Sequence, residues 1–179
     1  MAPTAGPLVT RFRPARDPMM PAMAMPIDSP APSRASLPIS AVLLATDLSS
    51  NSTTAEDEAL RLAAGLGARL VAVSVIDPGT LRLPGGRFHA RMDQVREERE
   101  RAAQLLVARA RDLGIPTAFL VWEGAPGEAI VDAADAERAD LIVLGSHGRR
   151  GVHRTLMGSV SDHVVRHAQC PVVVVRGPV

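Results

Sequence analysis

The sequence contains no lysine and no tyrosine, and its 179 residues include one cysteine, one tryptophan and three phenylalanines. With so few aromatic side chains, the chain cannot form the stacking surfaces on which proteins hold single-stranded nucleic acid. The single cysteine, Cys170, cannot form a disulfide within the chain. This favours a reducing, cytoplasmic location, and we interpret Cys170 as a small apolar residue beside a strand.

Excess charge and long apolar runs are missing as well. The formal net charge is +1, and all 20 basic residues are arginines. A nearly neutral chain lacks the electrostatic surface that attracts nucleic acid or anionic membranes, so we expect neither partner. No apolar run approaches the roughly 20 residues that are needed to span a bilayer. Apolar residues nevertheless make up 46% of the chain, which is enough for a sizeable core.

Residues 1–38 differ in composition from the rest of the chain. They contain nine of the 15 prolines and five of the seven methionines. Because proline donates no backbone hydrogen bond and blocks helix and sheet alike, we predict a disordered tail here. An alternative is that translation starts at one of the later methionines, which are Met19, Met20, Met23 and Met25. Residues 39–179 are expected to form a single domain.

Short apolar runs alternate with amphipathic segments from residue 39 onward. The apolar runs predict strands at 41–45, 70–76, 117–122, 140–145 and 171–175. The amphipathic segments predict helices at 53–66, 89–113, 126–137 and 159–168. Strands that alternate with helices pair in parallel through right-handed crossovers. The sequence therefore predicts an open, doubly wound α/β sheet with helices on both faces.

Helical periodicity also predicts which side chains of the first two helices face the sheet. In the first helix these are Ala55, Ala59, Leu62, Ala63 and Leu66. In the second helix they are Val95, Ala102, Leu105, Leu106 and Ala110.

A glycine pattern follows the fourth predicted strand. The segment Gly145-Ser-His-Gly148 is separated by nine residues from Gly158-Ser159, which begins the last helix. Glycine exposes its amide and permits a positive φ, successive amides form an anion-binding nest, and a helix amino terminus attracts negative charge. The hydroxyl of Ser161 and the charge of Arg149 lie close in the sequence. The pattern therefore predicts a cradle for several phosphate groups.

The position of this pattern in the fold extends the prediction. In open α/β sheets, ligands bind beyond the carboxyl ends of the strands, where the strand order reverses. This rule selects Asp47, the segment 75–77 and the loop after Gly145.

Structural alternatives stay open for several of these residues. Asp47 also suits a cap of the first helix, and Ser159 with Asp162 fits a capping arrangement. His163 and His167 have the i, i+4 spacing of metal ligands on a helix, but no third ligand is evident. We interpret this pair as surface histidines.

These residues together resemble the universal stress protein family, in its ATP-binding branch. The resemblance rests on Asp47 after an apolar strand, on Val75-Ile76-Asp77 and on the glycine pattern with its nine-residue spacing. Ser159-Val160-Ser161 and the segment 168–175 extend it over about residues 40–177. It implies a Rossmann-like, five-stranded parallel sheet in the order 3-2-1-4-5.

The same resemblance implies a ligand and a site. The ligand is ATP, accompanied by a divalent metal such as magnesium, with Asp47 at the nucleoside end and the backbone of Val75 against the adenine. The ribose and phosphates are expected at the amides of Gly145, Ser146 and Gly148. The outer phosphates are expected at Gly158, Ser159, Val160 and Ser161. The resemblance further implies a homodimer that pairs through strand 171–175.

A binding protein is the favoured interpretation of this site. No Walker-type lysine motif is present, and no Ser–His–Asp or Cys–His set is dictated by the spacing. We therefore predict an ATP-binding regulatory protein of the stress response. The alternatives are a slow ATPase or nucleotide-handling enzyme of a related α/β class, and a dimeric stress-interaction module without nucleotide.

Overall fold

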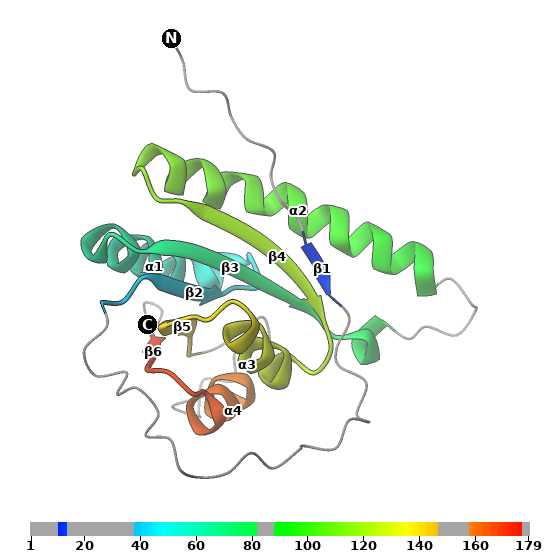
Figure 1. Ribbon diagram of the computed structural model, residues 1–179. Helices are drawn as coiled ribbons and strands as arrows, with labels where there is room; N and C mark the ends of the chain where they lie inside the picture. The colour runs from blue at the N-terminus through cyan, green and yellow to red at the C-terminus, as the bar shows by residue number, and fades with distance from the viewer. Residues whose placement is uncertain (1–10, 14–37, 82–87, 147–157, 177–179) are drawn as a thin grey trace.

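The computed structural model describes residues 11–13, 38–81, 88–146 and 158–176 (Figure 1). These residues form one sheet of six parallel strands, in the order β1-β4-β3-β2-β5-β6. The strands are β1 (Arg11–Arg13), β2 (Ala41–Ala45), β3 (Arg69–Ile76), β4 (Thr117–Glu123), β5 (Leu141–Gly145) and β6 (Val172–Val175). The helices are α1 (Thr53–Leu66), α2 (Phe88–Asp112), α3 (Pro126–Ala136) and α4 (Ser159–His167), with 3-10 turns η2 (Ser50–Ser52) and η3 (Pro78–Leu81).

The predicted topology is confirmed. The five strands from β2 to β6 lie in the order β4-β3-β2-β5-β6, which is the expected order 3-2-1-4-5. β2 stands at the point where the order reverses, because it pairs with β3 on one side and with β5 on the other. The sheet is therefore an open, doubly wound, Rossmann-like sheet.

Three residues of the predicted disordered tail form a strand instead. β1 pairs in parallel with β4, with Arg11 opposite Leu120 and Arg13 opposite Trp122. Composition gave no sign of this strand, because an edge with unpaired backbone groups accepts almost any extended segment. The rest of the predicted tail up to residue 37 lies outside the described residues.

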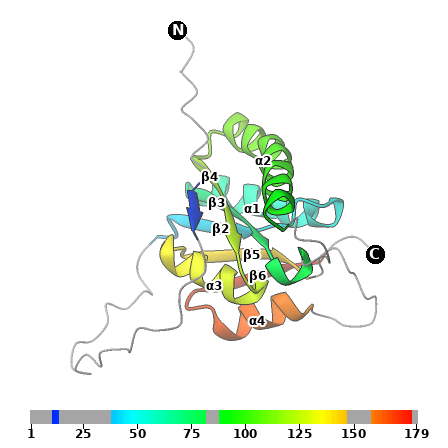
Figure 2. The same cartoon turned by 90° about the vertical axis from the view of Figure 1, so that its right-hand side faces the viewer.

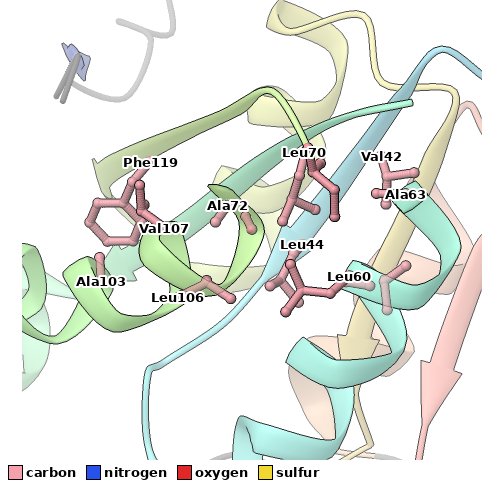
Figure 3. Close-up of a cluster of buried hydrophobic side chains, with 14 of the residues drawn as sticks. Val42, Leu44, Leu60, Ala63, Leu70, Ala72, Ala103, Leu106, Val107 and Phe119 are labelled. Carbon is pink, nitrogen blue, oxygen red and sulfur yellow. The ribbon is translucent and has the colours of Figure 1, made fainter. Parts of the chain in front are cut away.

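The helices form a layer on each face of the sheet (Figures 1 and 2). α1 and α2 cover one face, where Val42 and Leu44 of β2 join their side chains in a buried cluster (Figure 3). α3 and α4 cover the other face, where Leu43 of β2 contributes to a second cluster. Neighbouring residues of β2 thus serve opposite cores, which explains its uninterrupted apolar sequence.

The predicted inner faces of α1 and α2 need correction. In α1, Glu56 and Leu60 are buried, whereas Leu66 in the last turn is 45% exposed. In α2, the buried positions are Met92, Ala103, Leu106, Val107 and Ala110. Leu105 lies on the outer side and is 75% exposed. Both helices carry alanine and leucine on several sides. Apolar periodicity alone therefore did not predict which face of each helix turns toward the sheet.

Candidate functional site

The carboxyl ends of β2, β3 and β5 lie side by side at the point where the strand order reverses. The pairing of β2 with β3 ends at Ala45 and Val73, and the N–H of Thr46 then donates to the Val73 carbonyl at 2.9 Å. On the other side, Ala45 lies opposite Leu144 of β5. Asp47 and the start of the glycine pattern therefore follow neighbouring strand ends, as the sequence predicts.

The loop after β2 is held by polar side chains. The hydroxyl of Thr46 donates to Glu56 Oε1 at 2.7 Å and accepts the N–H of Leu48 at 2.9 Å. Asp47 Oδ1 accepts the N–H of Ser49 at 3.0 Å and the hydroxyl of Ser52. Asp47 thus holds the turn that precedes η2. The N-cap residue of α1 is Ser52, so Asp47 is not the cap of the first helix that the sequence offered as an alternative.

Two further features mark this loop as a place of local strain and unmet hydrogen bonding. Leu48 has a φ of 56°, in the left-handed region that a leucine rarely adopts. The hydroxyl of Ser49 is buried and has no hydrogen-bond partner among the residues that the structure describes. Such outliers concentrate at ligand sites, where surrounding contacts hold them in place.

Glu56 is a buried carboxyl group directly beneath the loop. Burial raises its pKa above the ordinary value, and the nearby charges of Asp57 and Asp47 act in the same direction. The hydrogen bond from Thr46 and the charge of Arg109, whose Nη1 lies 3.9 Å from Glu56 Oε2, oppose that rise. The loop therefore rests on a carboxyl group that is costly to ionise.

Helix α2 contributes one side chain to the same strand ends. Arg99 Nη1 donates to the main-chain carbonyl of Asp47 and, at 3.0 Å, to the hydroxyl of Ser74. Ser74 is completely buried, and it precedes Val75, which is half-buried against the core beneath α3 and α4. Arg99 thus joins the ends of β2 and β3.

The glycine pattern is described only at its two ends. Gly145 closes β5, and Ser146 is buried, with its N–H donated to the Val175 carbonyl at 2.8 Å. The Ser146 carbonyl accepts the N–H of Gly158 at 2.9 Å, so the two ends of the loop are bonded together. Gly148 and Arg149 lie outside the described residues.

The start of α4 leaves its first backbone amides without partners inside the helix. Gly158 is the N-cap residue, and no side chain of the described residues caps the helix, so the N–H groups of Ser159, Val160 and Ser161 have no acceptor within the helix. Ser159 is exposed and Val160 is half-buried. The Ser161 hydroxyl is buried and donates inward, to the carbonyl of Gly158 at 2.9 Å.

A groove of about 180 Å³ runs between the starts of α3 and α4. It is lined by Ala125, Pro126, Gly127, Glu128, Ser159, Val160 and His163. Gly127 is buried here, and a Cβ at this position would stand 2.7 Å from Cγ of His163. The two helix amino termini therefore meet closely, and both direct partial positive charge toward this groove.

A larger hollow of about 590 Å³ lies elsewhere, between α1 and α2. Its lining comes from α1 between Asp57 and Ala64 and from the end of α2 and the residue after it, Arg109 to Leu113. Because both helices run back from the carboxyl edge of the sheet, this hollow lies toward the amino edge and contains no predicted site residue.

The two histidines of α4 differ in exposure, since His163 is half-buried beside Gly127 and His167 is exposed. The rings of His163 and His167 stack with their centroids 4.1 Å apart, and His167 Nδ1 lies 2.8 Å from the His163 carbonyl oxygen. In the described ranges, no three His, Cys, Asp or Glu side chains form a group that could hold a metal ion. Likewise, none of the helices in these ranges is long and apolar enough to cross a bilayer.

The sequence missed Thr46, Glu56 and Arg99 as contributors to the site. Glu56 carried a signal, since it falls between Ala55 and Ala59 on the inner face of α1, where a carboxylate needs a buried partner. Arg99 carried none, because it is one arginine among several on a strongly charged helix.

The sheet order and the polar groups at its reversal point define a Rossmann-like α/β domain. A model of the universal stress protein family matches residues 38–176, and the chain belongs to this family. A universal stress protein of Methanocaldococcus jannaschii is 33% identical over 139 residues, which cover 76% of this chain and 82% of that protein.

Solved structures agree with this assignment. The universal stress protein UspA from Lactobacillus plantarum has a TM-score of 0.67 and 28% identity, with 78% of this chain and 99% of that chain covered. A universal stress protein solved in complex with cAMP has a TM-score of 0.57 and 26% identity, with 79% of this chain and 100% of that chain covered.

Proposed function

We propose that this chain binds an adenine nucleotide at the reversal point of its sheet, with ATP as the ligand, and acts as a regulatory module in a stress response. The observation that carries the proposal is the start of α4, which no side chain of the described residues caps and where Ser159 is exposed beside a groove. Unbonded amides at a helix amino terminus are suited to phosphate oxygens.

The proposed contacts with the phosphates depend on which N–H and hydroxyl groups already donate hydrogen bonds within the protein. The N–H groups of Ser146 and Gly158 are donated to backbone carbonyls, and the Ser161 hydroxyl points inward. The outer phosphates are therefore assigned to the amides of Ser159, Val160 and Ser161 and to the Ser159 hydroxyl. Gly145, Gly148 and Arg149 keep their proposed place on the inner side of the phosphate chain.

The nucleoside end is assigned to the ends of β2 and β3. The backbone of Val75 would contact the adenine, and Asp47 would stand beside the ribose. A ribose hydroxyl here would supply the partner that the Ser49 hydroxyl lacks among the described residues. The universal stress protein solved with cAMP supports the proposal of an adenine nucleotide. The proposal of a triphosphate is supported instead by the groups at the start of α4.

Magnesium would accompany the phosphates. Mg²⁺ keeps several waters and commonly uses one or two carboxylates together with substrate phosphates. Glu128 is the carboxylate that lines the groove, so we propose it as the protein group nearest to the metal. ATP is then expected to bind more tightly with magnesium than without it.

Two measurements on the full chain test the proposal. Mass spectrometry identifies the nucleotide that copurifies with the native protein, and calorimetry compares ATP, ADP, AMP and cAMP with and without magnesium. We expect ATP to be retained and to bind more tightly than AMP. Absence of any adenine nucleotide, together with no binding at millimolar ATP and magnesium, would refute the proposal.

The same samples separate a binding module from an enzyme. After incubation with the protein for much longer than binding takes, ATP is expected to remain unhydrolysed. Steady release of ADP that disappears on Gly148→Ala would instead assign a slow ATPase.

We also propose a homodimer that pairs through β6. This strand has β5 on one side, and all four of its valines are only half-buried within one chain. An apolar edge strand of this kind needs cover, and a second copy of the same strand provides it.

A further inference from the structure

Arg99 connects two chain segments that the sheet itself does not hold together at the proposed nucleoside end. Regular pairing of β2 with β3 stops at Ala45 and Val73, apart from the bond from Thr46 N–H to the Val73 carbonyl. Beyond this point β3 continues alone beside β4 as far as Ile76. Asp47 and Val75 therefore lie past the last backbone bond that joins their strands.

The guanidinium of Arg99 bridges this gap. Its Nη1 donates both to the main-chain carbonyl of Asp47 and to the Ser74 hydroxyl, the latter at 3.0 Å. One acceptor is the residue proposed for the ribose, and the other is next to the residue proposed for the adenine. Hydrogen bonds from a charged donor are stronger than those from a neutral one, so this bridge fixes the spacing of the two segments.

The loop after β2 needs such support. Leu48 holds a left-handed backbone conformation with a φ of 56°, which neighbouring contacts must stabilise. Glu56 supports the loop from α1 by accepting the Thr46 hydroxyl at 2.7 Å. Arg99 supports it from α2, on the side that faces β3.

We propose that Arg99 is a positioning residue of the nucleotide site, which sets the distance between Asp47 and Val75 and thereby the preference for adenine over guanine. This inference rests on the proposed function, because it concerns the same site. Arg99 acts through the backbone of Asp47 and through Ser74, without touching the nucleotide itself.

The test uses Arg99→Gln, Arg99→Lys and the control Arg101→Gln in the full chain. Arg101 is an exposed arginine of the same helix, whose Nε donates to the carbonyl of Glu97 at 3.3 Å. Calorimetry measures ATP, GTP and inorganic tripolyphosphate with each variant. The three ligands separate the nucleoside end from the phosphate end.

Arg99→Gln is expected to bind ATP about tenfold more weakly, because both charge-assisted hydrogen bonds that fix the spacing of the two segments are lost. The ratio of ATP to GTP affinity is expected to fall, while tripolyphosphate binds as in the wild type. Arg99→Lys is expected to recover part of the affinity, because an ammonium group can reach one of the two acceptors. Arg101→Gln should match the wild type with all three ligands.

Ser74→Ala provides a second route if Arg99→Gln fails to fold, since it removes only one acceptor of the bridge. It is expected to lower ATP affinity about threefold and to reduce the same selectivity ratio. If both sets of variants keep wild-type affinity and selectivity, the inference about Arg99 is wrong while the proposed function stands. An equal loss for ATP and tripolyphosphate would indicate a general structural role and would also overturn it. Failure of the wild type to bind any nucleotide would overturn the proposed function itself.

Discussion

The N–H of Ser146 donates to the carbonyl of Val175 at 2.8 Å, which bonds the start of the glycine pattern to the last residue of the edge strand. The carbonyl of Ser146 in turn accepts the N–H of Gly158, the N-cap residue of α4. The proposed phosphate site and the proposed dimer strand therefore share one backbone hydrogen-bond chain. A shift of α4 on binding nucleotide would reach β6 through a single residue.

The first prediction concerns the outer edge of β6. Ile142 and Ser146 donate to the carbonyls of Pro171 and Val175, so by the alternation of a parallel ladder Val173 also bonds to β5. Val172 and Val174 then direct their backbone groups outward. Proline is tolerated where the lost N–H faces away from the sheet. Val174→Pro is expected to stay folded and to weaken self-association at least tenfold, as measured by sedimentation at several concentrations.

Val173→Pro is the matched control for this experiment. Its N–H belongs to the ladder with β5, so the same substitution one residue earlier is expected to lower the free energy of unfolding by about 1–3 kcal/mol, because the acceptor on β5 loses its donor. A Val174→Pro protein that associates as tightly as the wild type would show that β6 is not the dimer interface.

The second prediction separates two serines of α4. The Ser159 side chain is exposed in the groove, and Ser159→Ala is expected to weaken ATP binding several-fold with an unchanged free energy of unfolding. The Ser161 hydroxyl is buried and bonded inward, so Ser161→Ala is expected to lower that free energy by about 1 kcal/mol. Calorimetry and urea denaturation of both variants check the pair. The reverse assignment of effects would contradict the phosphate contacts proposed above.

The sheet was predictable because each of its buried strands is encoded by a short run of neighbouring residues. Each buried strand is a short apolar run between turn residues, as in Ala41–Ala45 and Leu141–Gly145, and alternation with helices restricts the topology to few choices. The reversal point follows from that topology, and with it the neighbourhood of Asp47 and Gly145. The rotation of α2 was not predictable in the same way, because Leu105 and Leu106 are equally apolar and only one of them is buried.

The polar contacts of the site were not predictable, because they join distant parts of the sequence. Arg99 reaches Asp47 across 52 positions, and a single arginine carries no mark that distinguishes it from its neighbours. The inward direction of the Ser161 hydroxyl depends on where Ser146 lies, 15 positions away. Residue types and spacing therefore predict where the proposed site lies, while the contacts of each residue follow only from the three-dimensional structure.

The third prediction is a pH dependence that comes from Glu56. Its pKa is raised on folding from the ordinary value of 4.5, mainly by burial. The folded state therefore binds the proton more tightly than the unfolded state. This contribution to stability is present below about pH 4.5, and it is lost as the pH rises through the raised pKa. Glu56→Gln does not titrate, so its free energy of unfolding relative to the wild type is expected to increase with pH above 4.5.

Glu58→Gln in the same helix is the control, for which the opposite pH dependence of the free energy of unfolding is expected. The hydrogen bond from Arg61 lowers the pKa of Glu58, so ionised Glu58 favours the folded state. The free energy of unfolding of this variant relative to the wild type is therefore expected to fall as the pH rises. Urea denaturation at a series of pH values measures both. If the free energy of unfolding of Glu56→Gln relative to the wild type falls as the pH rises, the folded wild-type protein stabilises the ionised form of Glu56, contrary to this prediction.

The fourth prediction concerns the contact that brings the starts of α3 and α4 together. A Cβ added to Gly127 would meet Cγ and Cβ of His163 at 2.7 and 2.8 Å, and Cβ is too close to the backbone to move aside freely. Gly127→Ala is therefore expected to lower the free energy of unfolding by about 1–3 kcal/mol. Gly65→Ala in α1 is the control, because no atom of the described residues outside the neighbouring helix backbone lies within 4 Å of its added Cβ. It is expected to stabilise the protein by about 0.5–1 kcal/mol.

Adding His163→Ala to Gly127→Ala distinguishes this clash from a general intolerance of the position. The alanine side chain removes Cγ and the rest of the ring but keeps Cβ. A double-mutant cycle is therefore expected to show a favourable coupling that recovers part of the cost of Gly127→Ala, of about 0.5–1 kcal/mol. Both residues also line the groove that we assign to the outer phosphates. Gly127→Ala is therefore expected to weaken ATP binding more than adenosine binding, because the separation of the two helix starts affects only the phosphate end. Equal weakening of both ligands would place the phosphates away from this groove.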